Sequence, residues 1–393
     1  MERPMKVDAG ESYNGISSLT DFLKKQYLEG YIPFGGSKIK FVTGRPGSGK
    51  TFLADRIKED ACGLGYLTVS FSARDVWLHD FRELYLEVLK QCDIDHVLKG
   101  CADRIILELG YDPVKLSDGK NLMDYLSEIG EADPLIRGEI RSSLREKFIR
   151  NPRLDHNFGY ACSLITGGIL GHPVLEDSNR ELLLAFLQGD KTVKLAQLRA
   201  LGLSPSRVTR YNARNLLRSL SELIHLAGYA GLLIVIDDME ILLNRSAADA
   251  RRYTKLRRED AYESIRQLID DIDNMRYIMF MLCFDRELID NDNYGVKSYQ
   301  ALWMRIQNEV VSPRFNHFAD IIDMDRYGDE FYSEEVLGEM AERIRSQLIS
   351  QGFETRQPDP EEIRSLYERA QFGGVGLPGL LYHAVREKEE NHG

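Results

Sequence analysis

The sequence predicts an α/β protein built on a parallel sheet, and two observations support this prediction. A glycine-rich stretch, GRPGSGKT (44–51), lies between a segment with strand-like alternation and one with helical spacing. Two later apolar runs, 232–236 and 277–284, are each followed by acidic residues. Short runs that are apolar throughout indicate strands buried on both faces, as in a parallel sheet. Ligands bind at the carboxyl ends of such strands, so the site is expected there.

Composition limits the classes of protein that fit. The chain has 393 residues, of which 43% are hydrophobic and 29% charged, which suits two or three globular domains or one large core with insertions. A net charge of -11 argues against a broad nucleic-acid surface. The five cysteines form no C-x-x-C pair, so neither a disulfide framework nor a zinc site is indicated. This use of cysteine fits a reducing cytoplasm, and no apolar run is long enough to cross a bilayer.

The first strand and the loop after it carry the strongest motif. SKIKFVTG alternates as a strand does, and GRPGSGKT fits the pattern G-x-x-x-x-G-K-[ST] of a P-loop NTPase. Its glycines let backbone N–H groups surround phosphates, Lys50 would reach the β- and γ-phosphates, and the Thr51 hydroxyl would bind Mg²⁺. The alternative is a glycine-rich turn with an incidental lysine. The residues expected to contact ATP are Gly44, Arg45, Pro46, Gly47, Ser48, Gly49, Lys50, Thr51 and Phe52.

The segments around this motif suggest the domain order. An amphipathic helix, LTDFLKKQYLEGYI, leads into the first strand, the segment KTFLADRIKEDACGLG continues the loop as a helix, and YLTVSFSARDVW (66–77) is the next strand. The segment 78–215 has mostly helical patterns and is too long for a loop, so we expect an inserted helical domain. The predicted parts are a P-loop core in two pieces, 1–77 and 216–326, the helical insertion 78–215, and a C-terminal helical lid, 327–393.

Acidic residues follow the apolar run GLLIVI (231–236). Asp237 emerges at the end of the predicted strand and is expected to hold the magnesium together with Thr51. Asp238 stands where many P-loop ATPases carry the glutamate that activates water, but its side chain is one methylene shorter. Glu240 would face the same side as Asp238 if the strand continues, and is the second candidate for the base. Alternatively, both acids only solvate the strand end.

The next helix and strand repeat this arrangement. KLRREDAYESIRQLIDDIDNM (255–275) has helical spacing, and YIMFMLCFDR (277–286) is a buried strand that ends in Asp285 and Arg286. Arg286 is expected either to sense the γ-phosphate or to cap a surface turn. Farther along, Arg305 could act across a subunit boundary as an arginine finger, or pair with Glu309 one helical turn later.

Two basic clusters stand out in this acidic chain. The first lies within 137–153 and the second within 245–258. Either could contact DNA phosphates or an acidic partner protein, or simply be a solvated helix face. The first cluster contains Arg137, Arg141, Arg145, Lys147, Arg150 and Arg153; the second contains Arg245, Arg251, Arg252, Lys255, Arg257 and Arg258.

Several of these segments together resemble one known family. The pattern comprises GRPGSGKTFL, a helix ending in GYAG before the acidic strand, R-x-x-A-Y and RQLID on the next helix, and GVKSYQAL after the second strand. It is similar to the ATP-binding-domain family of BREX phage-exclusion systems. That resemblance implies an AAA-like ATPase that uses ATP and Mg²⁺ and works with other proteins of an antiphage defence or DNA-modification complex.

The sequence departs from this pattern at two places. Asp237-Asp238 replaces the usual Asp-Glu, which favours slow hydrolysis or hydrolysis stimulated by DNA or a partner. Near the C-terminus, Gly376-Leu377-Pro378 resembles the G-x-P element of STAND ATPases, which implies that Pro378 packs beside the adenine; a proline in the first turn of any helix is the alternative. The rival functions are a nucleotide-gated scaffold with little turnover, a DNA-stimulated motor that acts as a homo-oligomer, and a small-molecule kinase.

Overall fold

Parallel strands form a single sheet at the centre of the chain. The computed structural model describes residues 14–116, 120–244, 252–310 and 314–386. Within these ranges the sheet has five strands in the order β2-β3-β4-β1-β5, and every neighbouring pair is parallel. The α/β class is therefore confirmed, and strands occupy the four segments predicted as strands. The strands are β1 (Ser37–Gly44), β2 (Leu67–Ser72), β3 (Leu232–Asp237), β4 (Ile278–Asp285) and β5 (Ile321–Asp323).

The two apolar runs of the sequence are two of the three inner strands of this sheet. β4 lies between β1 and β3, and every residue of β3 and β4 except the final aspartate of each is buried. Strands covered on both faces need no polar alternation, which explains their continuous apolar composition. β5 is only three residues long, so no periodic pattern predicts it.

Helices cover both faces of the sheet and form two hydrophobic cores. One core lies under the N-terminal helix, the helix after the P-loop and the C-terminal helices. The other lies between the opposite face of the sheet and helices that come before and after β4 in the sequence. The first set is α1 (Asn14–Leu23), which continues as a π-helix (Lys24–Glu29), α2 (Lys50–Gly63), α15 (Glu334–Ser350), α16 (Pro360–Phe372) and α17 (Leu377–Arg386); the second includes α3 (Phe81–Gln91), α10 (Ala213–Leu226), α11 (Lys255–Asp271), α12 (Glu287–Asp290) and α13 (Gln300–Val310).

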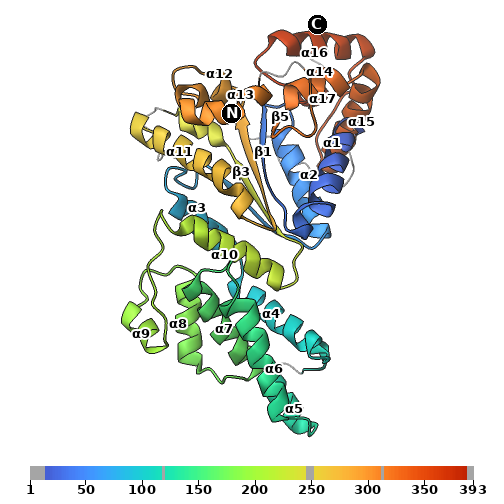
Figure 1. Cartoon of the computed structure of the whole chain (residues 1–393). Coiled ribbons are helices and arrows are strands. Elements are labelled where there is room, and N and C mark those ends of the chain that lie inside the picture. Colours follow the sequence, from blue (N-terminus) through green and yellow to red (C-terminus); the bar gives the residue numbers. More distant parts are fainter. Residues whose placement is uncertain (1–13, 117–119, 245–251, 311–313, 387–393) are drawn as a thin grey trace.

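Between β2 and β3 the chain makes a long helical excursion. Figure 1 shows its helices at the end of the molecule opposite the C-terminal helices. Its apolar side chains belong to the same core as one face of the sheet, so this segment packs as an extension of the sheet layer. The domain boundaries remain a prediction. The helices not yet named are α4 (Ile94–Glu108), α5 (Leu122–Glu128), α6 (Pro134–Leu144), a π-helix (Arg145–Ile149), α7 (His156–Leu170), α8 (Asp177–Leu187) and α9 (Leu195–Ala200).

The C-terminal segment predicted to be helical, 327–393, contains three helices in its described part, α15, α16 and α17. A further helix, α14 (Met324–Phe331), precedes them directly after β5 and begins before the predicted boundary. Asp323 caps α14 by accepting hydrogen bonds from the N–H groups of Asp325 and Arg326. This cap ties the last strand to the C-terminal helices. Short 3-10 turns complete the fold at Ile32–Phe34, Pro113–Lys115, Met239–Leu243, Ile272–Asn274 and Val296–Ser298.

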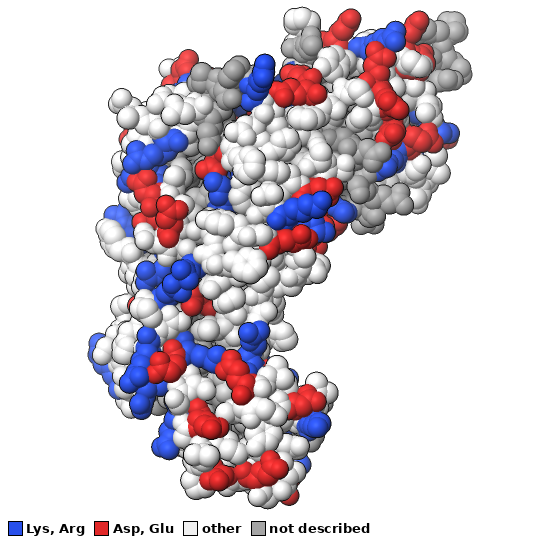
Figure 2. Space-filling view, turned by 45° about the vertical axis from the view of Figure 1, so that its right-hand side comes forward, with Lys and Arg blue, Asp and Glu red and all other residues white. Residues whose placement is uncertain are grey.

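The surface carries both signs of charge. In Figure 2, acidic and basic side chains alternate over the visible face, and the outline is concave between the sheet and the tip of the excursion. In the described part of the chain, no helix has the length and apolar character that a membrane span requires.

Candidate functional site

The loop between β1 and α2 has a backbone that only small residues adopt easily. Gly47 and Gly49 have φ angles of 77° and 98°, in the left-handed region that disfavours side chains. α2 begins at Lys50, so the positive end of its dipole faces the loop. Phe52 lies half-buried in the first turn of α2, against the core under the C-terminal helices. A loop of this shape followed by a helix presents N–H groups to an anion.

The Lys50 ammonium lies beneath this loop and is already fully paired. Its Nζ donates to the carbonyl oxygens of Gly44 at 3.1 Å and Arg45 at 3.0 Å, and forms an ion pair of 2.8 Å with Asp285. The side chain is only 9% exposed. Asp285 is thus a member of the site that the residue assignments from sequence missed. Its position at the end of an apolar strand was the available signal.

Thr51 and Asp237 face each other at the metal position that the sequence predicts. The Thr51 hydroxyl donates to the Asp237 carboxylate at 3.0 Å. Burial, with a smaller contribution from the charge of Asp238, raises the pKa of the Asp237 carboxyl above its usual range. An oxygen pair of this kind suits Mg²⁺, which takes one or two protein ligands and completes its shell with phosphates and water. No group of three or more His, Cys, Asp or Glu able to hold a metal occurs in the ranges that the structure describes.

The strand does not continue to Glu240, so the strand alternation that would place Asp238 and Glu240 on the same side does not apply. Both side chains nevertheless lie close together. β3 ends at Asp237, Asp238 has a φ of 59°, and Glu240 lies in the 3-10 turn that follows. Arg74, just after β2, contacts both acids, at 3.6 Å from Asp238 and 3.1 Å from Glu240. The Ser72 hydroxyl lies 2.6 Å from the Asp238 carboxylate. The end of β2 therefore holds both candidate bases.

Burial also acts on Glu240. Its pKa is raised, first by desolvation and then by the negative charges of Asp285 and Asp238. The Asp285 N–H points toward the Glu240 carboxylate at 3.4 Å. Four acidic side chains, from β3, its turn and β4, thus share one edge of the sheet with Lys50 and Arg74 as the nearby cations.

Arg286 does not contact the phosphate loop through its guanidinium. That group pairs with Asp323 at 2.8 Å and Asp290 at 3.2 Å, and only its backbone N–H donates to the carbonyl of Gly44. Arg286 follows the strand with helical backbone angles, and the side chain that pairs with Lys50 is that of Asp285, the last residue of β4. The prediction that Arg286 caps a surface structure agrees better with these contacts than the phosphate-sensing alternative.

The C-terminal segment packs directly on the outer side of the loop. The N–H groups of Gly376 and Gly379 donate to the carbonyls of Pro46 and Gly47, both at 2.8 Å. A Cβ on Gly376 would lie 2.5 Å from the Ser48 Cα, so no other residue fits there without movement. The contact is therefore backbone against backbone.

Arg45 extends this contact to two more elements. Its Nε lies 3.1 Å from the Asp325 carboxylate at the start of α14, and its N–H donates to the same side chain at 2.9 Å. Its guanidinium also donates to the carbonyls of Ala370 and Gly373 around the end of α16. One loop side chain thus joins the P-loop to α14 and α16.

Pro378 lies in the first turn of α17, beside the loop. It lines a cavity of about 10 Å³ together with Arg45, Ser48, Tyr332 and Tyr367. A space of this size has room for about one water molecule. The position predicted for an adenine is therefore closed in this structure.

Several residues of the two basic clusters have local partners. Lys147 pairs with Glu108 and Arg150 with Glu146, each at 2.7 Å. Arg258 is buried and donates to the carbonyls of Leu242 and Tyr253, so it is structural.

Two further arginines are also engaged. Arg257 lies over the Trp77 ring at 4.7 Å. Arg305 pairs with Asp270 of α11 at 3.0 Å. Arg245 and Arg251 lie outside the described residues.

Comparison with known proteins gives one match. The family model described as "BREX system ATP-binding protein BrxC/D" matches residues 15–368. No curated protein and no solved structure matches the chain.

Replacing Gly376 tests the backbone contact. We expect Gly376→Ala to lower the free energy of unfolding by about 1–3 kcal/mol, because the added methyl overlaps Ser48. The matched control is Gly338→Ala in α15, where a Cβ meets no atom within 4 Å and the change should stabilise the helix. Urea denaturation of both variants measures the difference; equal effects would contradict the contact.

The raised pKa of Asp237 predicts a pH-dependent effect. Between its unfolded and folded pKa values the native chain binds more protons than the unfolded chain, so this group's contribution to stability falls as pH rises through that window. In metal-free buffer, Asp237→Asn should therefore raise the melting temperature near neutral pH, and the gain should shrink as pH falls. Thermal unfolding over a pH series checks this. A difference in melting temperature between Asp237→Asn and the parent that grows toward acid pH would contradict a raised pKa of the Asp237 carboxyl.

Proposed function

The chain belongs to the BREX system ATP-binding protein family, and on this premise we propose that it binds ATP with Mg²⁺ at residues 44–52 and hydrolyses it slowly or when stimulated. The observation that carries the proposal is the convergence of Lys50, Thr51, Asp237 and Asp285 at one edge of the sheet. A lysine beneath a glycine-rich loop, with a hydroxyl and a carboxylate 3.0 Å apart beside it, matches what a phosphate chain and its cation require.

In this proposal the residues have separate tasks. Lys50 exchanges its contact with Asp285 for phosphate oxygens, since a phosphate brings more negative charge than one carboxylate. Thr51 and Asp237 hold Mg²⁺, which neutralises charge that develops on the phosphates. Asp238 orients the attacking water and accepts its proton, with Glu240 as the second candidate. Arg286 acts through its ion pairs with Asp290 and Asp323 and makes no phosphate contact.

A nucleotide-gated switch with little turnover is the second candidate. The contacts of Asp238 with Ser72 and of Arg74 with both Asp238 and Glu240 favour it, because a base held in an ion pair is a poorer proton acceptor. Turnover would then require β2 and its following loop to move. Such movement is the step that DNA or a partner protein would stimulate.

The C-terminal helices provide the conformational output in this proposal. Since the cavity beside Pro378 has room for about one water, the base of ATP enters only if α16 and α17 shift from the loop. Their hydrogen bonds to Pro46 and Gly47 make that shift sensitive to the state of the phosphate loop. We therefore assign residues 327–393 the role of a lid on an AAA-like core, with 78–215 as the helical insertion.

The working context follows from the family and from the surface. Other proteins of a BREX system are the proposed partners, with a DNA contact through the exposed part of the second cluster, Arg252 and Lys255. All five cysteines are free and four are buried, which supports a reducing, cytoplasmic setting. This proposal includes a homo-oligomer, in which Arg305 would have to leave Asp270 to act in a second copy.

Two substitutions should change ATP affinity in opposite directions. Lys50→Ala removes the cation for the phosphates and is expected to weaken ATP binding more than about tenfold. Asp285→Asn removes the charge that competes for Lys50 and should tighten it by roughly threefold to tenfold. Titration calorimetry with ATP and Mg²⁺ measures both. An unchanged affinity for ATP in Lys50→Ala would contradict the assignment of this site.

A measurement of phosphate release distinguishes an ATPase from a nucleotide-gated switch with little turnover. We expect slow release from ATP by the full chain, faster with duplex or single-stranded DNA or partner proteins, and lost in Lys50→Ala and Asp238→Ala. Arg74→Gln should raise the unstimulated rate by about tenfold or more if its ion pairs restrain the base. Measurable ATP binding with no release under any condition would establish the switch.

A further inference from the structure

Three segments meet at the surface where the helical excursion joins the sheet, beside α3, α10 and α11 (Figure 1). Their ranges are 77–83, 204–214 and 252–260. The Arg82 side chain donates to the carbonyl of Val208 at 3.0 Å, which ties the first two segments together. The Arg257 guanidinium lies over the Trp77 ring at 4.7 Å, which brings the third segment against the first. The three segments therefore form one continuous surface.

This surface is basic in an acidic protein. The three segments carry eight basic and four acidic residues, whereas the whole chain has a net charge of -11. Three of the acids are engaged, since Asp80 caps α3, Glu83 accepts a backbone N–H, and Glu259 lies 3.9 Å from Lys255. The fourth, Asp260, is exposed. Six exposed side chains form what we call the junction surface: Arg207, Arg210, Tyr211, Arg252, Lys255 and Arg257.

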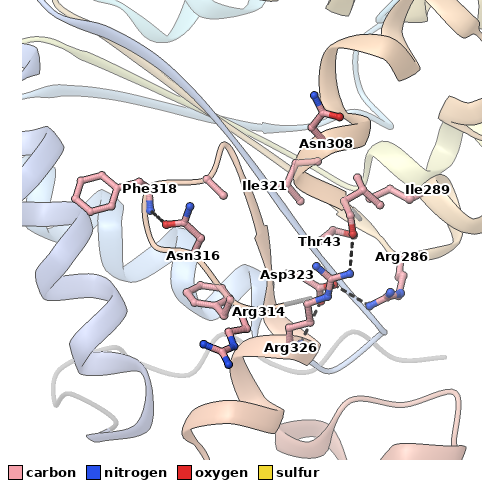
Figure 3. A pocket seen from close by; sticks show the side chains of 13 residues that line it. Thr43, Arg286, Ile289, Asn308, Arg314, Asn316, Phe318, Ile321, Asp323 and Arg326 are labelled. Atoms are coloured by element: carbon pink, nitrogen blue, oxygen red, sulfur yellow. Dashed lines mark hydrogen bonds and ion pairs between the residues drawn. The ribbon is translucent and has the colours of Figure 1, made fainter. Parts of the chain in front are cut away.

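The arginines of the junction surface are not neutralised by acids. None of the four forms an ion pair with a carboxylate in the part of the chain that the structure describes, and Arg207 donates to a neutral group, the carbonyl of Lys191. Around the cavity of Figure 3, by contrast, Arg286 and Arg326 both pair with Asp323, at 2.8 Å and 3.4 Å. Arginines without acidic partners are available to phosphate groups. The junction surface therefore fits a polyanion.

The Tyr211 ring adds an aromatic group to this charge. The side chain is 80% exposed. The Arg210 guanidinium lies 4.9 Å from the ring centroid and donates to the Tyr211 hydroxyl at 2.8 Å, so it fixes the direction of the ring. This hydrogen bond, and more weakly the charges of Asp260 and Asp80, raise the pKa of Arg210, so the pair lies near the other two segments. An exposed ring held among cations is a platform on which a planar group can stack.

We propose that the junction surface binds single-stranded DNA, with a base stacked on Tyr211 and the backbone phosphates on the arginines. Single strands bind to basic surfaces with exposed rings because every base has a face that can stack, whereas a duplex hides these faces between its base pairs. An acidic protein would use the cations without the ring. Binding at this surface rests on the DNA contact of the proposed function and requires no ATP.

The junction surface adjoins the candidate ATPase site through one loop. Arg74, which contacts Asp238 and Glu240, lies in the loop that continues from β2 to Trp77. Trp77 in turn supports Arg257. A strand bound at Arg257 would therefore act on the segment that holds both candidate bases.

The test is fluorescence anisotropy of a labelled oligothymidine of about twenty nucleotides with the full chain, without ATP or Mg²⁺. Tyr211→Ala removes the stacking platform and should weaken binding roughly tenfold, whereas Tyr211→Phe keeps the ring and should bind within about twofold of the parent. Arg257→Gln removes one phosphate contact. It should lower the slope of log affinity against log salt concentration by about 0.7.

Phe372→Ala is the matched control. Phe372, at the end of α16, is 90% exposed and lies outside the three segments. Tyr211→Ala and Phe372→Ala should both melt at the parent temperature and bind ATP as the parent does, and only Tyr211→Ala should lose affinity for the oligothymidine. A chain that binds the oligothymidine but not ATP would retain this surface and contradict the proposed ATP site.

Four results would overturn the proposal. No binding of the oligothymidine, or equal affinities of Tyr211→Ala and Phe372→Ala, would remove the surface. A duplex of the same length that binds as tightly would contradict the preference for single strands. Poly-glutamate that competes as well as unlabelled oligothymidine would assign the surface to an acidic protein, and tighter binding of oligouridine would assign it to RNA.

Discussion

The parallel register of β4 between β1 and β3 is the constraint on which the candidate site depends. Gly44 lies opposite Asp285, and Ile236 lies opposite Leu282, so the ends of three strands meet at one edge. A slip of β4 by one residue would present Phe284 or Arg286 to Lys50 and turn the buried strand inside out. The continuous burial of β3 and β4 makes that slip costly. Packing of apolar side chains thus fixes the position of an ion pair.

The loop is held on the side that a phosphate does not use. The N–H and C=O of a peptide unit point in opposite directions. Since the carbonyls of Pro46 and Gly47 accept from the C-terminal segment, and those of Gly44 and Arg45 accept from Lys50, the shape of the loop is set through its carbonyls. The N–H groups of Arg45 and Ser48 donate to Asp325 and to the Arg45 carbonyl, and the other N–H groups of the loop are those proposed to contact the ligand. Formation of a phosphate cradle is therefore coupled to docking of a segment more than three hundred residues away in sequence.

Sequence patterns predicted what is local and missed what tertiary contacts decide. The loop motif, the buried strands and the C-terminal helices each have a period or a motif of their own. Which of Asp285 and Arg286 faces the loop depends on where β4 enters the sheet, and Glu240 was misplaced because Asp238 turns the chain after β3. β5 has too few residues for a pattern. Arg258 was interpreted as a surface cation, but backbone carbonyls satisfy its guanidinium inside the protein. The need for glycine at position 376 follows only from its approach to Ser48.

The attachment of the helical excursion to two adjacent strands has a mechanical consequence. The chain leaves the sheet at Ser72, on the edge that carries Asp238, and returns at Leu232, on the opposite edge. The excursion is therefore attached directly to the amino end of β3, and to the carboxyl end of β2 through the loop that carries Arg74. A force on its distant helices would rotate the excursion about its attachment to β3. The loop after β2 would then be the first part of the site to be displaced.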